Sequence, residues 1–142
     1  MAIWQYTFEI IPKEILSELG VSNFISPDDY EKCDFECEMD LVEALVADMM
    51  RGESWSEEII VYGDAESTCI KFFIENEKVT GIIARLDIRY DCSIILNSIV
   101  QFCSLRAFAI LDEDKILDLN ATSIIEHIKE SNQLMLYRKL LG

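Results

Sequence analysis

Apolar and polar residues alternate one by one in several parts of the chain, and a period of two is typical of β-strands. The clearest case covers residues 79–90, where the apolar residues fall mainly on one side and the charged residues on the other. Residues 69–75 alternate in the same way, and residues 59–62 form a β-branched and aromatic run before them. Short polar loops separate the three runs, which predicts an antiparallel meander with one covered face and one wetter face. In this meander we expect Leu86 and Ile88 to be buried.

Two further regions carry a strand pattern. Residues 4–10 alternate aromatic or aliphatic side chains with polar ones, which predicts a half-buried strand. Residues 107–111 and 115–119 flank the acidic tripeptide Asp112-Glu113-Asp114 and predict a hairpin. The expected sheet is therefore mainly antiparallel and combines the N-terminal strand, the meander and the hairpin.

Apolar residues three and four positions apart predict helices instead. This spacing, with its start and stop signals, places helices over residues 13–19, 40–50 and 91–106. We expect Pro12 in the first turn of the first helix, and Ser26 with the acids after it is typical of another helix start. Ser123 and Glu126 form a capping box that predicts the start of the last helix. The chain is thus predicted to form one α+β domain over residues 1–142, with helices packed on one face of the sheet.

Length and composition limit the class of protein. A chain of 142 residues with 51% hydrophobic residues can bury a substantial core, which argues against disorder. No apolar run approaches the roughly 18–20 residues of a membrane span, and the N-terminus lacks the pattern of a signal peptide. The five cysteines have no scaffold-like spacing, so we expect free thiols and a cytoplasmic protein.

The formal net charge of −15 limits the kinds of partner that the chain is expected to bind. Such a chain repels phosphate backbones, so we expect no nucleic-acid binding. The same charge favours basic proteins and speeds encounters with them. An alternative is that the acidity only confers solubility.

The acidity is concentrated in residues 28–58, which hold twelve acids and two bases. This segment accounts for −10 of the total charge, and the asymmetry is the most informative charge feature of the chain. We therefore expect it to bind a basic protein partner. The candidate contact residues are Asp28, Asp29, Glu31, Asp34, Glu36 and Glu38.

A second candidate site lies on the third run of the meander. Arg85, Asp87 and Arg89 fall on one face of a strand, and two arginines around a carboxylate could hold an anionic ligand or substrate. The favoured interpretation is an ordinary cross-strand charge ladder. Motifs for nucleophilic catalysis, phosphate cradling and dinucleotide binding are absent, so an enzyme is less expected than a binding protein. A third hypothesis is self-assembly into homo-oligomers through Phe73 and Ile83 as exposed apolar residues.

A metal site is a further hypothesis. Cys33 and Cys37 lie four positions apart, and Glu36, Glu38 and His127 could join them as ligands. Zinc sites usually pair two ligand clusters, and the second is missing here. We therefore expect no metal and no cofactor, with His127 on a helix surface.

The order of features resembles that of small bacterial proteins of the toxin-immunity type. The resemblance rests on three short motifs and a final helix that Ser131 begins and Leu140-Leu141 end. The motifs are Trp4-Gln5-Tyr6, Tyr62-Gly63-Asp64 and Arg85-Leu86-Asp87-Ile88-Arg89. It implies a small acidic cytoplasmic protein that binds a basic toxin domain, and it transfers no functional residue to this chain.

Overall fold

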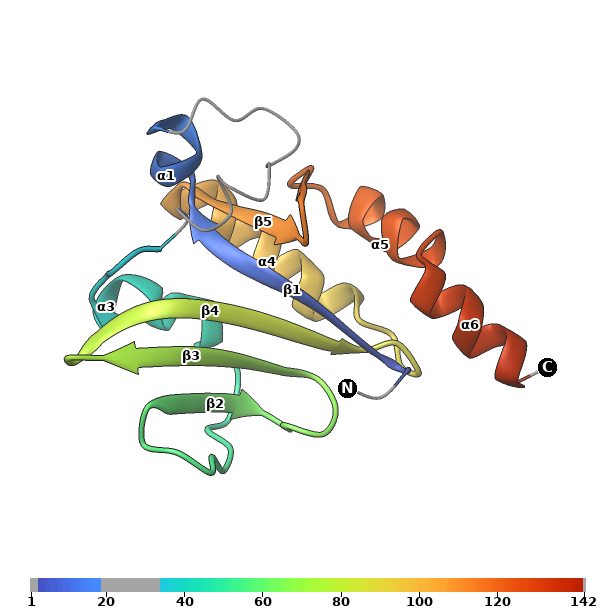
Figure 1. Cartoon of the computed structure of the whole chain (residues 1–142), viewed down its shortest axis with the longest axis horizontal. Helices are drawn as coiled ribbons and strands as arrows, with labels where there is room; N and C mark the ends of the chain where they lie inside the picture. The colour runs from blue at the N-terminus through green and yellow to red at the C-terminus, as the bar shows by residue number, and fades with distance from the viewer. Residues whose placement is uncertain (1–2, 19–33, 142) are drawn as a thin grey trace.

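The computed structural model describes residues 3–18 and 34–141, which form a six-stranded antiparallel sheet with helices (Figure 1). The strands are β1 Gln5–Pro12, β2 Ile59–Gly63, β3 Cys69–Glu75, β4 Lys78–Asp87, β5 Phe108–Asp112 and β6 Lys115–Leu117. Their order across the sheet is β2-β3-β4-β1-β5-β6, so the N-terminal strand lies between the meander and the hairpin. The predicted α+β class with a mainly antiparallel sheet is confirmed.

The helices vary greatly in length. They are α1 Lys13–Glu18, α3 Met39–Val42, the 3-10 helix η1 Glu43–Val46, α4 Ser93–Arg106, α5 Ala121–Lys129 and α6 Asn132–Leu141. Figure 1 shows the long α4 lying across one face of the sheet, while α6 extends away from it. No helix of the described residues is long and apolar enough to cross a bilayer.

The main core lies between α4 and the apolar face of the sheet. The predicted alternation supplies this face, because Ile70 pairs with Ala84 in register and Phe72 pairs with Ile82. Leu86 is fully buried there, as predicted. The helices complete the cluster with residues such as Val42, Leu45, Leu96, Ile99, Phe102, Ile124 and Ile128.

The opposite face of the sheet carries a smaller apolar cluster. Ile11 of β1, Ala109 and Leu111 of β5 and Leu16 of α1 pack together there. The remainder of this face is more polar, which agrees with the expected difference between the two faces.

The ends of two strands differ from prediction. β4 ends at Asp87, so Ile88 is only half-buried and Tyr90 is 66% exposed. Pro12 lies in β1 and pairs with Phe108 rather than opening a helix. A proline is tolerated there because it is the last residue of the strand and its missing N–H ends the ladder.

The helix predictions are met only in part. The helix expected over residues 40–50 is divided into the short α3 and η1. The helix start expected at Ser26 lies outside the described residues and stays a prediction. The last helix begins earlier than its proposed capping box, because Asn120 Oδ1 accepts a hydrogen bond of 3.0 Å from the Ser123 amide. A second helix, α6, follows after Ser131, whose Oγ accepts from the Leu134 amide at 3.2 Å.

Candidate functional site

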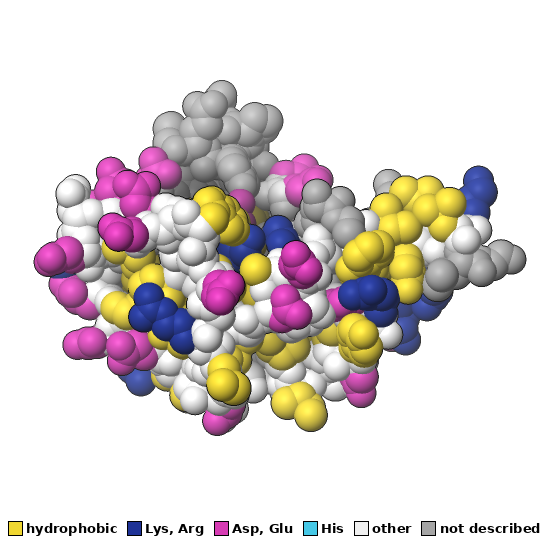
Figure 2. All heavy atoms as spheres, turned by 90° about the horizontal axis from the view of Figure 1, so that it is seen from below, with side chains coloured by type: hydrophobic (Ala, Val, Ile, Leu, Met, Phe, Trp, Pro, Cys, Tyr) yellow, Lys and Arg dark blue, Asp and Glu magenta, His cyan; other side chains and the backbone are white. Residues whose placement is uncertain are grey.

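The described part of the acidic segment, residues 34–58, is a solvent-facing surface. It contains one base, Arg51. Its nine acids are all exposed: Asp34, Glu36, Glu38, Asp40, Glu43, Asp48, Glu53, Glu57 and Glu58. Figure 2 views the molecule from the β2 side and shows acidic side chains gathered on the left, with exposed hydrophobic side chains among them. We call these nine acids of residues 34–58 the acidic surface.

Local backbone structure explains why the first of these acids point outward. Cys37 forms an antiparallel bridge with Val79, through hydrogen bonds of 2.9 and 2.8 Å between their backbone groups. In an extended segment neighbouring side chains point to opposite sides. Since Cys37 packs on the core, Glu36 and Glu38 face solvent. Glu38 forms an ion pair with Lys78, and it is the one acid of this surface with an ion pair among the described residues.

Three of the six acids proposed from sequence belong to this surface, and three cannot be placed. Asp34, Glu36 and Glu38 follow one another at every second position. The other three proposed contact residues, Asp28, Asp29 and Glu31, lie outside the described residues.

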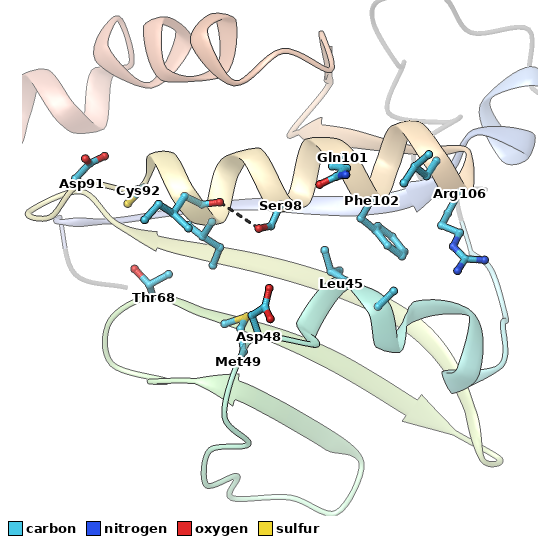
Figure 3. Close-up of a pocket in the computed structure, with 14 residues that line it drawn as sticks. Leu45, Asp48, Met49, Thr68, Asp91, Cys92, Ser98, Gln101, Phe102 and Arg106 are labelled. Atoms are coloured by element: carbon cyan, nitrogen blue, oxygen red, sulfur yellow. Dashed lines mark hydrogen bonds between the residues drawn. The ribbon is translucent and has the colours of Figure 1, made fainter.

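An apolar groove runs beside the acidic surface, between α4 and the η1 region (Figure 3). Its volume is about 530 Å³. Leu45 and Met49 come from the η1 side, and Phe102 comes from α4. We call it the α4 groove; its remaining lining residues are Ala44, Asp48, Thr68, Asp91, Cys92, Ile94, Ile95, Ser98, Gln101, Leu105 and Arg106.

Charged residues stand at the two ends and on one wall of the α4 groove. Asp91 lies at the N-terminal end of α4, Arg106 at its C-terminal end, and Asp48 on the η1 side (Figure 3). Asp91 accepts a hydrogen bond of 2.9 Å from the Ser93 amide, although the N-cap residue of α4 is Cys92 and not Asp91. The Ser93 hydroxyl and amide lower the pKa of Asp91, so this carboxylate stays charged at neutral pH.

The thiol in the α4 groove is not an activated nucleophile. Burial raises the pKa of Cys92, and the nearby carboxylates of Asp87 and Asp91 raise it further. A nucleophilic cysteine needs the opposite shift. The described lining of the groove therefore gives Cys92 no activating partner.

Arg85, Asp87 and Arg89 form internal contacts rather than a charge ladder. The register places Thr7 opposite Arg85, and Gln5 opposite Asp87. The expected ladder is therefore wrong, because Cys69 lies opposite Arg85 on β3 and no residue paired with Arg85 or Asp87 is charged.

Asp87 instead anchors a buried hydrogen-bond network. Its side chain is 0% exposed and receives Arg89 Nε at 2.9 Å, Arg89 Nη2 at 2.6 Å and Ser67 Oγ at 2.7 Å. The hydrogen bonds from Arg89 lower the pKa of Asp87 to about 2. The Arg89 guanidinium also lies over the Trp4 ring, 4.5 Å from its centroid.

This network fastens the loop between β2 and β3 onto the polar face of the sheet. Arg85 Nη1 donates to the Ala65 carbonyl at 2.9 Å, and Gln5 Nε2 donates to the Glu66 carbonyl at 2.9 Å. The Thr68 hydroxyl accepts from the Asp87 amide at 3.0 Å. The described arrangement gives these arginines a structural role, and the five principal pockets of the described residues do not include them.

His127 forms a side-chain contact that was not expected for a residue on a helix surface. Its Nε2 lies 2.7 Å from Asp112 Oδ2, and the Tyr6 hydroxyl donates to the same carboxylate oxygen. Burial, and then the hydrogen bond to Asp112, raise the pKa of Tyr6 well above its usual value, so this phenol stays protonated. The contact joins β1, β5 and α5. Among the described residues no group of three metal-ligating side chains exists, and Cys33 is not described.

The two residues proposed for self-assembly do not form an exposed apolar surface. Phe73 and Ile83 are both half-buried, and Phe73 packs over Gly81, which carries no side chain to displace it. The most exposed large hydrophobic residues of the described chain lie elsewhere, at Met50 and Ile94.

Comparison with protein-family models, with curated proteins and with solved structures finds no match. The function must therefore be argued from the residues of this chain alone.

The α4 groove was missed by the sequence reasoning, although a signal for it exists. Helical spacing puts Ile95, Ile99 and Phe102 on one side of α4, and the structure buries Ile99 and Phe102. Ile94 and Leu105 are eleven positions apart, which is about three helical turns, so they share the other side. An apolar pair on the outer side of an amphipathic helix is the pattern that marks an exposed contact surface.

Proposed function

We propose that this protein is a non-catalytic binding protein that uses its acidic surface to mask a basic partner protein. The carrying observation is that all nine described acids of residues 34–58 are exposed, with one base among them. Clustered like charges repel one another in the free protein, and a basic partner removes that repulsion on binding. An immunity protein that covers a basic toxin domain is a function of this kind.

Electrostatics of this type act mainly on the rate of association. Exposed charges at the rim of an interface steer the partner into contact, and added salt screens them. The proposed function therefore predicts a fast association that slows steeply as ionic strength rises.

The test is a pair of charge reversals with the same total charge change. The partner is captured from the native host and purified, and its association is measured by stopped flow at low and high salt. Replacing Asp34 and Glu36 by lysine removes charge from the acidic surface, whereas Asp114→Lys with Asp118→Lys changes the β5–β6 edge, at the other end of the strand order from β2. All four side chains are exposed, so both variants should keep the fold.

We expect the first variant to associate at least tenfold more slowly at low salt, and the second to associate nearly as fast as the parent protein. Equal rates for the first variant and the parent would show that the acidic surface is not the contact region. Equal slowing of both variants would show that the association rate depends only on the net charge of the protein.

A further inference from the structure

The outer side of α4 carries two large, exposed apolar residues near its two ends, with polar residues between them. Ile94 is 85% exposed and Leu105 is 75% exposed, and both border the α4 groove. The inner side of the same helix is apolar, with Leu96, Ile99 and Phe102 in the core. Together with Leu45, Met49 and Phe102 of the groove, Ile94 and Leu105 form an apolar surface that is open to solvent.

The groove is long enough for several turns of a bound helix, and its lining is largely apolar. Ile94 and Leu105 are eleven residues apart, which corresponds to about 17 Å along α4. Between them Ser98 and Gln101 face the groove, and the floor contains Leu45 and Phe102. Amphipathic helices bind such grooves by placing apolar residues from successive turns into them.

The charged residues around the groove indicate which kind of helix can bind there. Asp48 stands on the η1 wall and Asp91 at one end, while Arg106 stands at the other end. Asp48 is also one of the nine acids of the acidic surface, so that surface reaches the groove at this residue. A helix whose polar side carries lysine or arginine complements this wall. A second copy of this chain is disfavoured because each copy carries a net charge of −15.

We propose that the α4 groove binds a basic amphipathic α-helix of the partner protein. The apolar side of that helix packs between Ile94 and Leu105, and its basic side faces Asp48 and the acidic surface. This inference rests on the proposed function and adds the structural class of the bound segment and its place on the chain.

The test uses a defined probe rather than an unknown partner. The probe is a fluorescein-labelled 18-residue peptide of leucine and lysine with helical periodicity. Two control peptides carry glutamate in place of lysine, or the same leucines and lysines in an order without helical periodicity. Binding to the full chain is measured by fluorescence anisotropy at two salt concentrations.

Two variants with matched chemistry locate the site. Ile94→Ser with Leu105→Ser removes the exposed apolar side chains of the groove. Met135→Ser with Leu140→Ser removes two comparably exposed apolar side chains from α6, which lies outside the groove. Exposed substitutions of this kind should change stability little, and circular dichroism with a urea unfolding curve verifies that both variants fold.

We expect the periodic lysine peptide to bind, and its dissociation constant to rise at least tenfold in the groove variant and less than twofold in the α6 variant. Both control peptides should bind at least tenfold more weakly than the periodic lysine peptide. No binding of the periodic lysine peptide, or equal binding to the groove variant and the parent, would overturn the proposal.

Two outcomes separate this inference from the proposed function. If Asp34→Lys with Glu36→Lys weakens peptide binding while the groove variant does not, the acidic surface binds basic partners without the groove. If sedimentation shows that the parent self-associates and the groove variant does not, the occupant is a second copy, and the proposal of a basic partner helix at this groove is wrong.

Discussion

Replacing Asp87 by asparagine should destabilise the protein at neutral pH and much less in acid. The carboxylate is fully buried, and its hydrogen bonds with Arg89 lower its pKa from 3.8 to about 2. Because one pKa unit corresponds to about 1.36 kcal/mol, the charged form stabilises the folded state by about 2 kcal/mol at neutral pH. The amide of asparagine has nearly the same shape but cannot supply this charge.

The direction of the pH dependence follows from the lowered pKa. A carboxylate with a depressed folded-state pKa contributes its full stabilisation above pH 3.8 and loses it as the pH falls through about 2. The free energy of unfolding of the two proteins should therefore differ by about 2 kcal/mol at pH 7 and converge towards pH 2.

Urea unfolding at a series of pH values between 2 and 7 measures this difference. A difference of about 2 kcal/mol corresponds to a shift of about 1 M in the urea midpoint, given the slopes usual for small proteins. Asp114→Asn in the exposed β5–β6 turn is the control and should change the free energy by less than about 0.5 kcal/mol. An Asp87→Asn effect that is the same at pH 2 and pH 7 would refute the assigned role of the Arg89 contact.

Three further predictions concern the core, a turn and the contact between His127 and Asp112. Leu86→Ala should lower the free energy of unfolding by about 2–5 kcal/mol because the side chain is fully buried, and a thermal unfolding midpoint equal to that of the parent would contradict the core assignment. Gly63→Ala should cost about 1–3 kcal/mol in urea unfolding, because φ is +91° and the added Cβ would lie 2.6 Å from a backbone oxygen; a neutral result would show that the turn can rearrange. A double-mutant cycle of His127→Ala and Asp112→Ala at pH 6 should give a coupling energy of about 0.5–3 kcal/mol, and strictly additive effects would mean that the contact contributes nothing.

The local pattern of the sequence predicted the elements better than their connections. Alternation alone located β3 and β4 and placed Leu86 on the buried face of the sheet, because each strand must place its own apolar residues on the core. The sheet order could not be obtained in this way, since the two neighbours of β1 come from residues 78–87 and 108–112 and nothing local selects them.

The candidate sites, like the sheet order, depend on contacts between residues that are far apart in the sequence. The outward direction of Glu36 and Glu38 follows from the two-residue period around Cys37 once the bridge to Val79 is known. The internal role of Asp87 could not be predicted, because it depends on a loop that folds back over the sheet from twenty residues earlier in the chain. The positions of Ile94 and Leu105 are a signal for an exposed surface, but the sequence alone does not say that the η1 region lies across a groove from them.

The central place of β1 has a consequence for the order in which the protein can fold during synthesis. Glu9 pairs with Leu111, so the ribosome must add about a hundred residues before β1 meets its second neighbour. At ~5–20 residues per second this takes roughly 5–20 s. The β2–β3–β4 meander, whose strands are joined by short connections, can pair within that interval. β1 must therefore remain unpaired on one side until β5 is made, and chaperones that hold apolar strands have several seconds in which to bind it.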